Sequence, residues 1–475
     1  MSHLADLLLL QLKRIVAAGI AIVVLSPASA VRADESGPIR VSEDPYADSM
    51  TQHKTEVEPV LAADGDTIVA AFQVGRFFAP GSENIGWATS KDAGKHWQHG
   101  FLTGTTIVAG GSWLGVSIPS IAFDRKHHTF LIQSVPFDDQ GTGRGIYISR
   151  SSDGINWSKV STVAPGGNIF FSWIACDNHV KSAFYGNCYG AWTDFDKTVD
   201  ELIVSNDGGN TWSSVVNSDQ LAGAINSIAI QPNGNFVLLG RGGGPNGDQQ
   251  FAIQSVDGGH SLNATVFITT SQFDYPYLRS DPTPTSAVDR DGTIYVIFSD
   301  CRFRPGCPFV LFPPNDLVMT TSTNGVNWSA IKRIPIDPVT GTIDHVLPGV
   351  AALSIGDDEE DDDAPKAGRP HIKLALTYYS IDNAVACVPA NCDLNAEYIS
   401  SDDGGVSWHH AREIAGPMMQ TWLATTYAGQ MVTDYLSPVF VHGKPWGAFA
   451  LAHLPDSATG MLDEAIYAVK LSDDE

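Results

Sequence analysis

The sequence has few basic residues, few cysteines and no long apolar segment beyond its first residues. Its 475 residues include 28 Lys and Arg against 53 Asp and Glu, which gives a formal net charge of −25. Nucleic acids and anionic membranes bind basic surfaces, so this charge argues against both as partners. Long amphipathic helical patterns are missing too, and the short apolar or alternating segments that remain predict β-strands.

The early apolar run predicts an export signal at residues 1–33. Lys13 and Arg14 precede the run at 15–25, and Ala28 and Ala30 form a small-residue cleavage site. We expect cleavage after Ala30 or Ala33 and a secreted protein, extracellular or periplasmic, with 34–475 as a single domain. A membrane anchor is the alternative, but the run is too short for a bilayer about 30 Å thick.

The six cysteines fit that compartment. The cysteines form three close pairs, Cys176 with Cys188, Cys301 with Cys307, and Cys387 with Cys392, which predict three local disulfides. Metal binding is the alternative, but there is no Cys-x-x-Cys pattern. The acids from Asp357 to Asp363 predict a solvated loop; structural calcium is the alternative, although the ligands are not spaced for it, and no other cofactor is expected.

One short sequence motif recurs six times in the chain. The copies are SKDAGKHW at 90–97, SSDGINW at 151–157, SNDGGNTW at 205–212, SVDGGHSL at 255–262, STNGVNW at 322–328 and SDDGGVSW at 401–408. Each lies between two strand-like runs, so each predicts a hairpin turn in which Asp or Asn accepts backbone N–H groups and Gly takes a positive φ. The chain is therefore a repeat protein.

These copies resemble the Asp-box repeat of the sialidase-like β-propeller superfamily. The resemblance implies an all-β propeller of four-stranded antiparallel blades, with the box on the face opposite the binding site. The box spacing averages about 62 residues, so residues 34–475 hold about seven units. We expect seven blades, closed by pairing of Ile39–Ser42 with Ile466–Leu471, which removes free edges. Six blades are the alternative.

Arginines and carboxylates gather where loops should surround the channel on the face away from the boxes. Arginine binds carboxylates with two parallel hydrogen bonds, so the arginines suit an acidic sugar. Pairing with nearby acids is the alternative, Arg279 with Asp281 and Arg302 with Asp300. The substrate-binding candidates are Arg76, Arg241, Arg279 and Arg302.

Three carboxylates and one tyrosine are the catalytic candidates: Asp281, Asp300, Asp434 and Tyr435. Carboxylates serve as acid or base at glycosidic bonds, and Tyr435 could act as a nucleophile activated by a neighbouring carboxylate, as sialidases use. Turn caps and packing are the structural alternatives. His53, His345 and His453 also fall near these loops, which matters because some propeller relatives use a histidine.

The resemblance breaks at one motif. Sialidases carry Arg-Ile-Pro before the first box, whereas here Arg333-Ile334-Pro335 follows the fifth. Three functions remain: a sialidase-like glycoside hydrolase acting on an acidic saccharide, a polysaccharide lyase, and a non-catalytic propeller that binds glycan or protein, in each case as a monomer.

Overall fold

The computed structural model describes residues 31–32, 37–47, 49–220, 223–244, 247–273, 278–307, 313–354, 372–382, 387–388 and 391–472. Apart from residues 31 and 32, the expected export signal lies outside these ranges. The acidic run 357–363 lies outside them as well. Both therefore stay predictions.

Four sheets contain four antiparallel strands each. The first has β11 (Ile169–Cys176), β12 (Cys188–Asp194), β13 (Val199–Ser205) and β14 (Val216–Asn217); the second has β15 (Ala224–Ile230), β16 (Phe236–Gly244), β17 (Gly247–Ser255) and β18 (Val266–Thr270). The third has β19 (Thr285–Val288), β20 (Ile294–Asp300), β21 (Asp316–Ser322) and β22 (Lys332–Arg333); the fourth has β23 (Asp344–Ser354), β24 (Ile372–Ile381), β25 (Asp393–Ser401) and β26 (Arg412–Met419).

The other main strands form three four-stranded groups. Neighbouring groups are connected through single residue pairs, in which Ser82 lies opposite Val116 and Thr55 lies opposite Glu464. One group has β3 (Gln52–Asp64), β4 (Thr67–Arg76), β5 (Ser82–Ser90) and β6 (His96–Phe101); the next has β7 (Gly115–Asp124), β8 (Thr129–Phe137), β9 (Gly145–Ser151) and β10 (Ser161–Pro165). The last has β29 (Val439–Val441), β30 (Lys444–His453), β31 (Asp463–Lys470) and β2 (Ile39–Arg40). Short elements complete the fold: β1 (Val31–Arg32), β27 (Ala424–Thr426), β28 (Gly429–Met431) and the 3-10 turn η2 (Gln420–Trp422).

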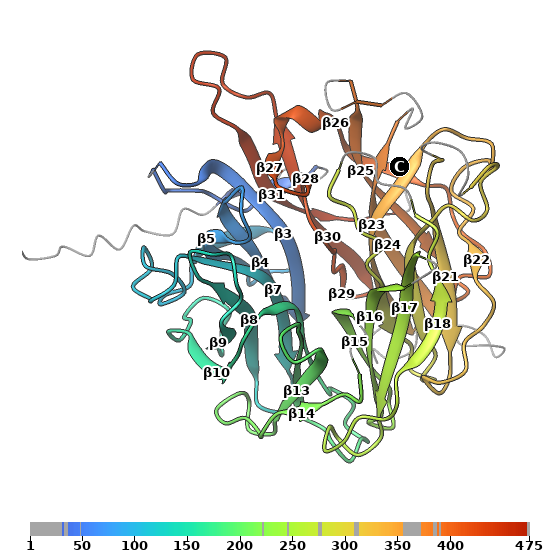
Figure 1. Ribbon diagram of the computed structural model, residues 1–475. Coiled ribbons are helices and arrows are strands. Elements are labelled where there is room, and N and C mark those ends of the chain that lie inside the picture. The colour runs from blue at the N-terminus through green and yellow to red at the C-terminus, as the bar shows by residue number, and fades with distance from the viewer. Residues whose placement is uncertain are drawn as a thin grey trace, which may run out of the picture.

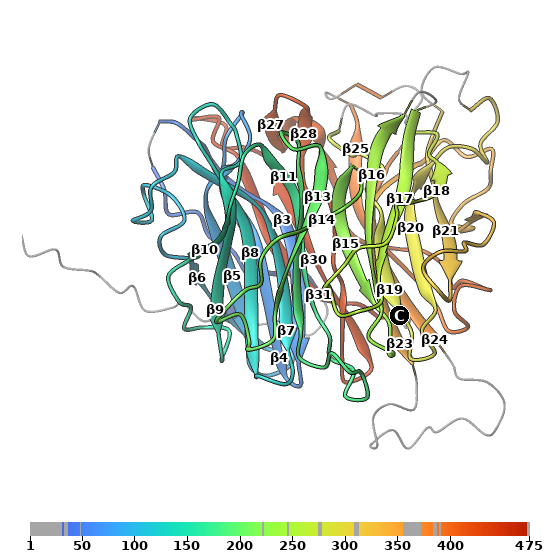
Figure 2. The same cartoon turned by 60° about the horizontal axis from the view of Figure 1, so that its bottom comes forward.

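The sheets follow one another around a central axis (Figures 1 and 2), and the red end of the chain meets the blue beginning. There Ile39 pairs with Ala468 and Arg40 with Tyr467, so the predicted closure between the first and last strands is present. The described residues contain no α-helix, and among them we find no helix with the length and hydropathy to cross a membrane. The all-β prediction is confirmed.

The apolar core lies within and between neighbouring sheets. The rings of Tyr379 on β24 and Phe449 on β30 lie 5.8 Å apart, and those of Trp97 on β6 and Trp446 on β30 lie 6.3 Å apart. Such contacts between sheets take the place of covering helices.

The six repeated sequences form turns that share one hydrogen-bond pattern. In the first, the Ser90 hydroxyl donates to Asp92 at 2.9 Å and accepts from the Gly94 N–H at 2.8 Å. The same hydroxyl-to-carboxylate distance of 2.9 Å recurs at Ser151, Ser205, Ser255 and Ser401, and the Asn324 variant has 3.3 Å from Ser322. The side chains thus satisfy backbone groups inside the turn, as the composition predicts.

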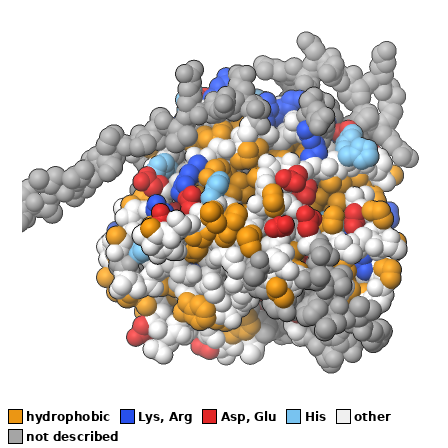
Figure 3. All heavy atoms as spheres, turned by 90° about the horizontal axis from the view of Figure 1, so that it is seen from above, with side chains coloured by type: hydrophobic (Ala, Val, Ile, Leu, Met, Phe, Trp, Pro, Cys, Tyr) orange, Lys and Arg blue, Asp and Glu red, His pale blue; other side chains and the backbone are white. Residues whose placement is uncertain are grey.

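Three disulfides are present, Cys176–Cys188, Cys301–Cys307 and Cys387–Cys392, which confirms the predicted pairing. The described residues leave no cysteine free. The face in Figure 3 shows acidic and basic side chains among hydrophobic ones rather than one large basic patch.

Candidate functional site

The strand register separates the repeated turns from the predicted site residues. On β4 and β5, Arg76 lies opposite Ser82, whereas Ile68 at the other end lies opposite Ser90, where the turn begins. Arg76 is therefore at the end of the sheet away from the turn. This agrees with the expectation that chemistry and turns occupy opposite faces.

β-Bulges in the first strands of several sheets change the direction in which particular side chains point. Glu58, Ile118, Phe171 and Leu347 have φ values of 54–57°, and each lies at a shift in pairing register. A left-handed φ is costly for such residues, and a bulge turns the side chain away from the regular alternation. Glu58 and Phe171 thus occupy equivalent places on two different strands.

An upper cavity lies at this end of the molecule. Its lining comes from seven segments and consists of Arg76, Pro80, Gly81, Ser117, Ile118, Phe137, Phe170, Phe171, Arg279, Tyr427, Asp434 and Tyr435. Its volume is only about 10 Å³. That is room for about one water molecule, so a larger ligand would lie at the opening.

Two buried arginines meet in this cavity. Arg76 donates through Nη1 to the carbonyl oxygens of Phe77 at 2.8 Å and Ala79 at 2.6 Å, and its Nη2 makes no hydrogen bond to the described residues. Arg279 forms an ion pair with Asp434 through Nη2. Burial and the Arg279 charge lower the pKa of Arg76 to about 10, so both side chains remain cationic at neutral pH.

A glutamate and a tyrosine complete the group. Tyr435 donates to the carbonyl oxygen of Pro119 at 2.9 Å, and its hydroxyl lies 3.4 Å from Glu58 Oε2, which also accepts from Gln73. Burial, with the Asp434 charge, raises the pKa of Glu58 to about 7, and burial raises the pKa of Tyr435 well above its usual value. A carboxyl group with a pKa near 7 is suited to proton transfer.

The charges in the upper cavity do not balance at slightly acidic pH. With Glu58 protonated, Arg76 and Arg279 face a single anion, Asp434. One elementary positive charge is then left over in a chain that is acidic overall. The cavity therefore favours an anion.

A second ion pair lies on the same segment as Arg279. Arg241 on β16 contacts Asp281 and also Asp248, at 3.4 Å. Leu278 and Ser280 are buried, whereas Arg279 and Asp281 are partly exposed. The pair of Arg279 with Asp281, which was the structural alternative for these residues, does not form: Arg279 contacts Asp434 on another segment, and Asp281 contacts Arg241.

The remaining predicted pair lies elsewhere. Arg302 binds Asp300 through two hydrogen bonds, Nε at 2.9 Å and Nη2 at 2.7 Å, which was the structural alternative for these two residues. Both lie at and just after the end of β20. Neither lines the upper cavity.

A separate buried network joins β21, β22 and the loop after β20. Arg304 and Arg333 each contact both Asp316 and Asp337, at 2.6–2.8 Å. Asp316, Asp337 and His345 lie close enough together to hold a metal ion. The two arginines already neutralise the two carboxylates, so this donor set does not fit a cation.

The candidate histidines contribute nothing to the cavity lining. His345 is fully buried, and burial lowers its pKa to about 4. His53 lies 3.9 Å from Asp44, and the exposed His453 lies 4.0 Å from Asp463.

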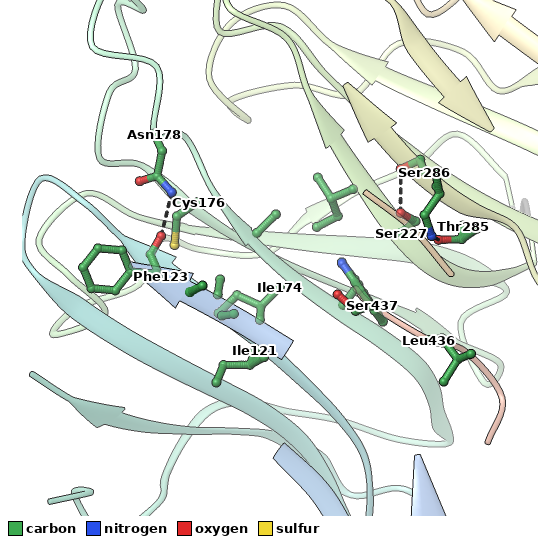
Figure 4. A pocket seen from close by; sticks show the side chains of 17 residues that line it. Ile121, Phe123, Ile174, Cys176, Asn178, Ser227, Thr285, Ser286, Leu436 and Ser437 are labelled. Atoms are coloured by element: carbon green, nitrogen blue, oxygen red, sulfur yellow. Dashed lines mark hydrogen bonds between the residues drawn. The ribbon is translucent and has the colours of Figure 1, made fainter. Parts of the chain in front are cut away.

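A lower cavity of about 280 Å³ occupies the axis beneath the upper one (Figure 4). Ser227 and Ser286 share a hydrogen bond of 2.7 Å across it, and Asn178 donates to the Phe123 carbonyl at 2.8 Å. Its lining has no charged side chain, and Cys176 is in a disulfide. Trp173 of the lower cavity and Tyr435 of the upper one meet edge to face, 5.1 Å between ring centroids. The charged side chains of the two cavities thus line the upper one.

Neither a protein-family model nor a curated protein sequence matches this chain. Similar solved structures include a GH93 α-L-arabinofuranosidase of Fusarium graminearum with arabinobiose, 12% identical, TM-score 0.47, over 91% of this chain and 97% of that one. The NanB sialidase of Streptococcus pneumoniae is 13% identical, TM-score 0.44, over 91% and 70%. A leech intramolecular trans-sialidase is 12% identical, TM-score 0.42, over 71% and 67%. Sialidases are thus among the similar structures. At such low sequence identity the likeness concerns the fold alone, so the chemistry of the site has to follow from the residues of this chain.

Of the residues predicted from the sequence, Arg76, Arg279, Asp434 and Tyr435 line the upper cavity together. Glu58 was not among the predicted site residues. No sequence signal marks the bulge that turns Glu58 toward Tyr435.

Proposed function

We propose that this protein is a secreted glycoside hydrolase that acts on an acidic saccharide. The observation that carries the proposal is that Arg76, Arg279 and Tyr435 line one cavity, with Glu58 buried behind Tyr435 at 3.4 Å from its hydroxyl. The arginines supply a carboxylate site, and the glutamate and tyrosine supply a proton acceptor and a nucleophile.

The carboxylate of the substrate would lie between the two guanidinium groups. Arg76 Nη2 is not used by the described residues, and the ion pair of Arg279 with Asp434 uses only Nη2 of Arg279. Charge-assisted hydrogen bonds to carboxylates are strong and directional, and they gain strength in a partly dehydrated site.

The proposed reaction is a double displacement. The Tyr435 hydroxyl loses its proton to Glu58, and its oxygen bonds to the anomeric carbon as the glycosidic C–O bond breaks. Arg279 holds Asp434 and Arg241 holds Asp281 in ion pairs, so the departing oxygen takes its proton from a water molecule at the opening of the cavity. The hydroxide left behind is the nucleophile of the second step, and Glu58 then returns its proton to the Tyr435 oxygen. This second displacement hydrolyses the tyrosyl intermediate and retains the anomeric configuration.

The proposal includes the architecture and the compartment. We propose a single seven-bladed domain, residues 34–475, in which the six repeats are Asp boxes. The group of β29, β30, β31 and β2 supports the seventh blade. The three disulfides support export, since they persist in oxidising compartments.

A non-catalytic glycan-binding propeller is the second candidate. Burial favours it: Glu58 is 0% and Tyr435 3% exposed, so a substrate reaches the Tyr435 oxygen only if neighbouring side chains move. The arginines would serve a binding protein equally well.

Incubation of the mature protein with sialosides, uronic-acid glycans and rhamnogalacturonan-type polymers separates the two candidates. We expect new reducing ends from an acidic substrate and loss of about a hundredfold or more in turnover with Tyr435→Phe. Tyr295→Phe is the matched control, because Tyr295 also donates to a carboxylate, Asp289, at 3.0 Å outside the cavity. Binding without cleavage, or equal activity of both variants, contradicts the enzyme proposal. Unsaturated products would show a lyase instead.

A further inference from the structure

Four phenylalanines form a connected group that leads out of the upper cavity. The rings of Phe137 and Phe170 lie 5.0 Å apart, Phe170 and Phe171 6.2 Å apart, and both lie 6.4 Å from Phe195. The first three line the cavity beside Arg76 and Arg279, whereas Phe195 follows β12 and lies beyond the lining. The group thus runs from the arginines to the surface.

Exposure increases along this group. Phe137 is buried, Phe170 and Phe171 are partly exposed, and Phe195 is 37% exposed. Phe171 has the left-handed backbone of the bulge, at the place equivalent to Glu58 on β3. A bulky residue is costly in that conformation, so the bulge places this ring in the lining at an energetic cost.

Resting on the proposed function, we propose that Phe170, Phe171 and Phe195 bind the apolar C–H face of the sugar unit linked to the acidic one. The ligand is then an oligosaccharide of at least two units. The size of the cavity supports this, because its volume of about 10 Å³ is that of about one water molecule, and the sugar rings therefore lie at the opening. Aromatic rings are rigid, apolar surfaces that pack against such faces at little entropic cost.

Binding by titration calorimetry tests the inference with two ligand pairs: galacturonic acid with digalacturonic acid, and N-acetylneuraminic acid with 3′-sialyllactose. Wild-type protein should prefer at least one disaccharide or trisaccharide over its monosaccharide. Phe195→Ala should lower the affinity for that larger ligand about threefold to tenfold and leave the affinity for the monosaccharide unchanged. Phe267→Ala is the matched control, since Phe267 is an exposed ring 6.2 Å from Phe251 on the outer strand β18.

Three outcomes overturn the inference: no preference for the larger ligand, an unchanged preference in Phe195→Ala, or binding of none of the four ligands. Its failure is distinguishable from failure of the proposed function. If Tyr435→Phe abolishes cleavage while Phe195→Ala keeps the preference, only the inference fails. If the preference depends on Phe195 but nothing is cleaved, only the enzymatic proposal fails.

Discussion

Two buried groups of arginines and carboxylates in this molecule differ in how completely their charges are paired. Around Arg304 and Arg333, both arginines contact both Asp316 and Asp337. Around Arg76 and Arg279, one arginine has a carboxylate partner and the other binds backbone carbonyls. The first group is closed and the second is open, and the arginines of the second line the upper cavity. We infer that closed pairing marks a structural role and open pairing marks a ligand site.

Breaking the closed group should have the largest effect on stability. Asp337→Ala leaves two buried arginines sharing a single carboxylate, which should lower the free energy of unfolding by about 3–5 kcal/mol. Asp281→Ala, at an ion pair where the carboxylate is 32% exposed, should cost about 1 kcal/mol or less. Urea denaturation of the two variants measures both values. Equal losses would show that the two ion pairs do not differ as described.

Removing an arginine should reduce ligand binding only where that arginine belongs to the ligand site rather than to a structural ion pair. Arg279→Gln should lower the affinity for an acidic glycan about tenfold to a hundredfold, because it removes a charge-assisted contact. Arg302→Gln also leaves a carboxylate, Asp300, without its arginine, so it matches the folding cost but lies outside the cavity. Calorimetric titration of folded variants, checked by melting temperature, should show the loss only in Arg279→Gln. The same loss in both variants would remove the distinction.

The affinity of the open group for an acidic ligand should also depend on pH, with a smaller effect than the substitutions above. The pKa of Glu58 is raised to about 7, so Glu58 is neutral below that pH and anionic above it. Ionisation adds a negative charge beside the arginines, and affinity for an acidic ligand should therefore fall as pH rises through about 7. The chemical step should speed up over the same range, because the anionic form is the proton acceptor. Affinity in Glu58→Gln should be flat from pH 6 to 8, and a persistent slope there would assign the titration to another group.

Much of the fold follows from the sequence, because the repeated turns and alternating runs are local signals. Pairing of Ile39 with Ala468 was predictable from the missing strand at the chain end, and the disulfides from short cysteine spacing. The local pair of Arg302 with Asp300 was foreseeable from their spacing, but the partners of Arg241 and Arg279 were not, since they depend on which segments converge in the fold. Arg279 therefore reaches Asp434, distant in sequence, rather than Asp281.

The bulges explain most of what the sequence could not show. An ordinary β-strand alternates its side chains with a period of two, and this rule misplaces every residue at a bulge. Glu58 and Phe171 both lie at such positions, and nothing in their neighbouring residues marks a left-handed φ. The proton acceptor and the aromatic group both depended on this feature.

The most direct test of the open group compares each acidic ligand with its own carboxyl-reduced form. Calorimetric titration of wild-type protein with digalacturonic acid and with 3′-sialyllactose, each beside its reduced counterpart, isolates the contribution of the carboxylate. The arginines should make at least one acidic ligand bind about tenfold or more tightly than its reduced form. Equal affinities in both pairs would contradict the claim that Arg76 and Arg279 are left open for a carboxylate.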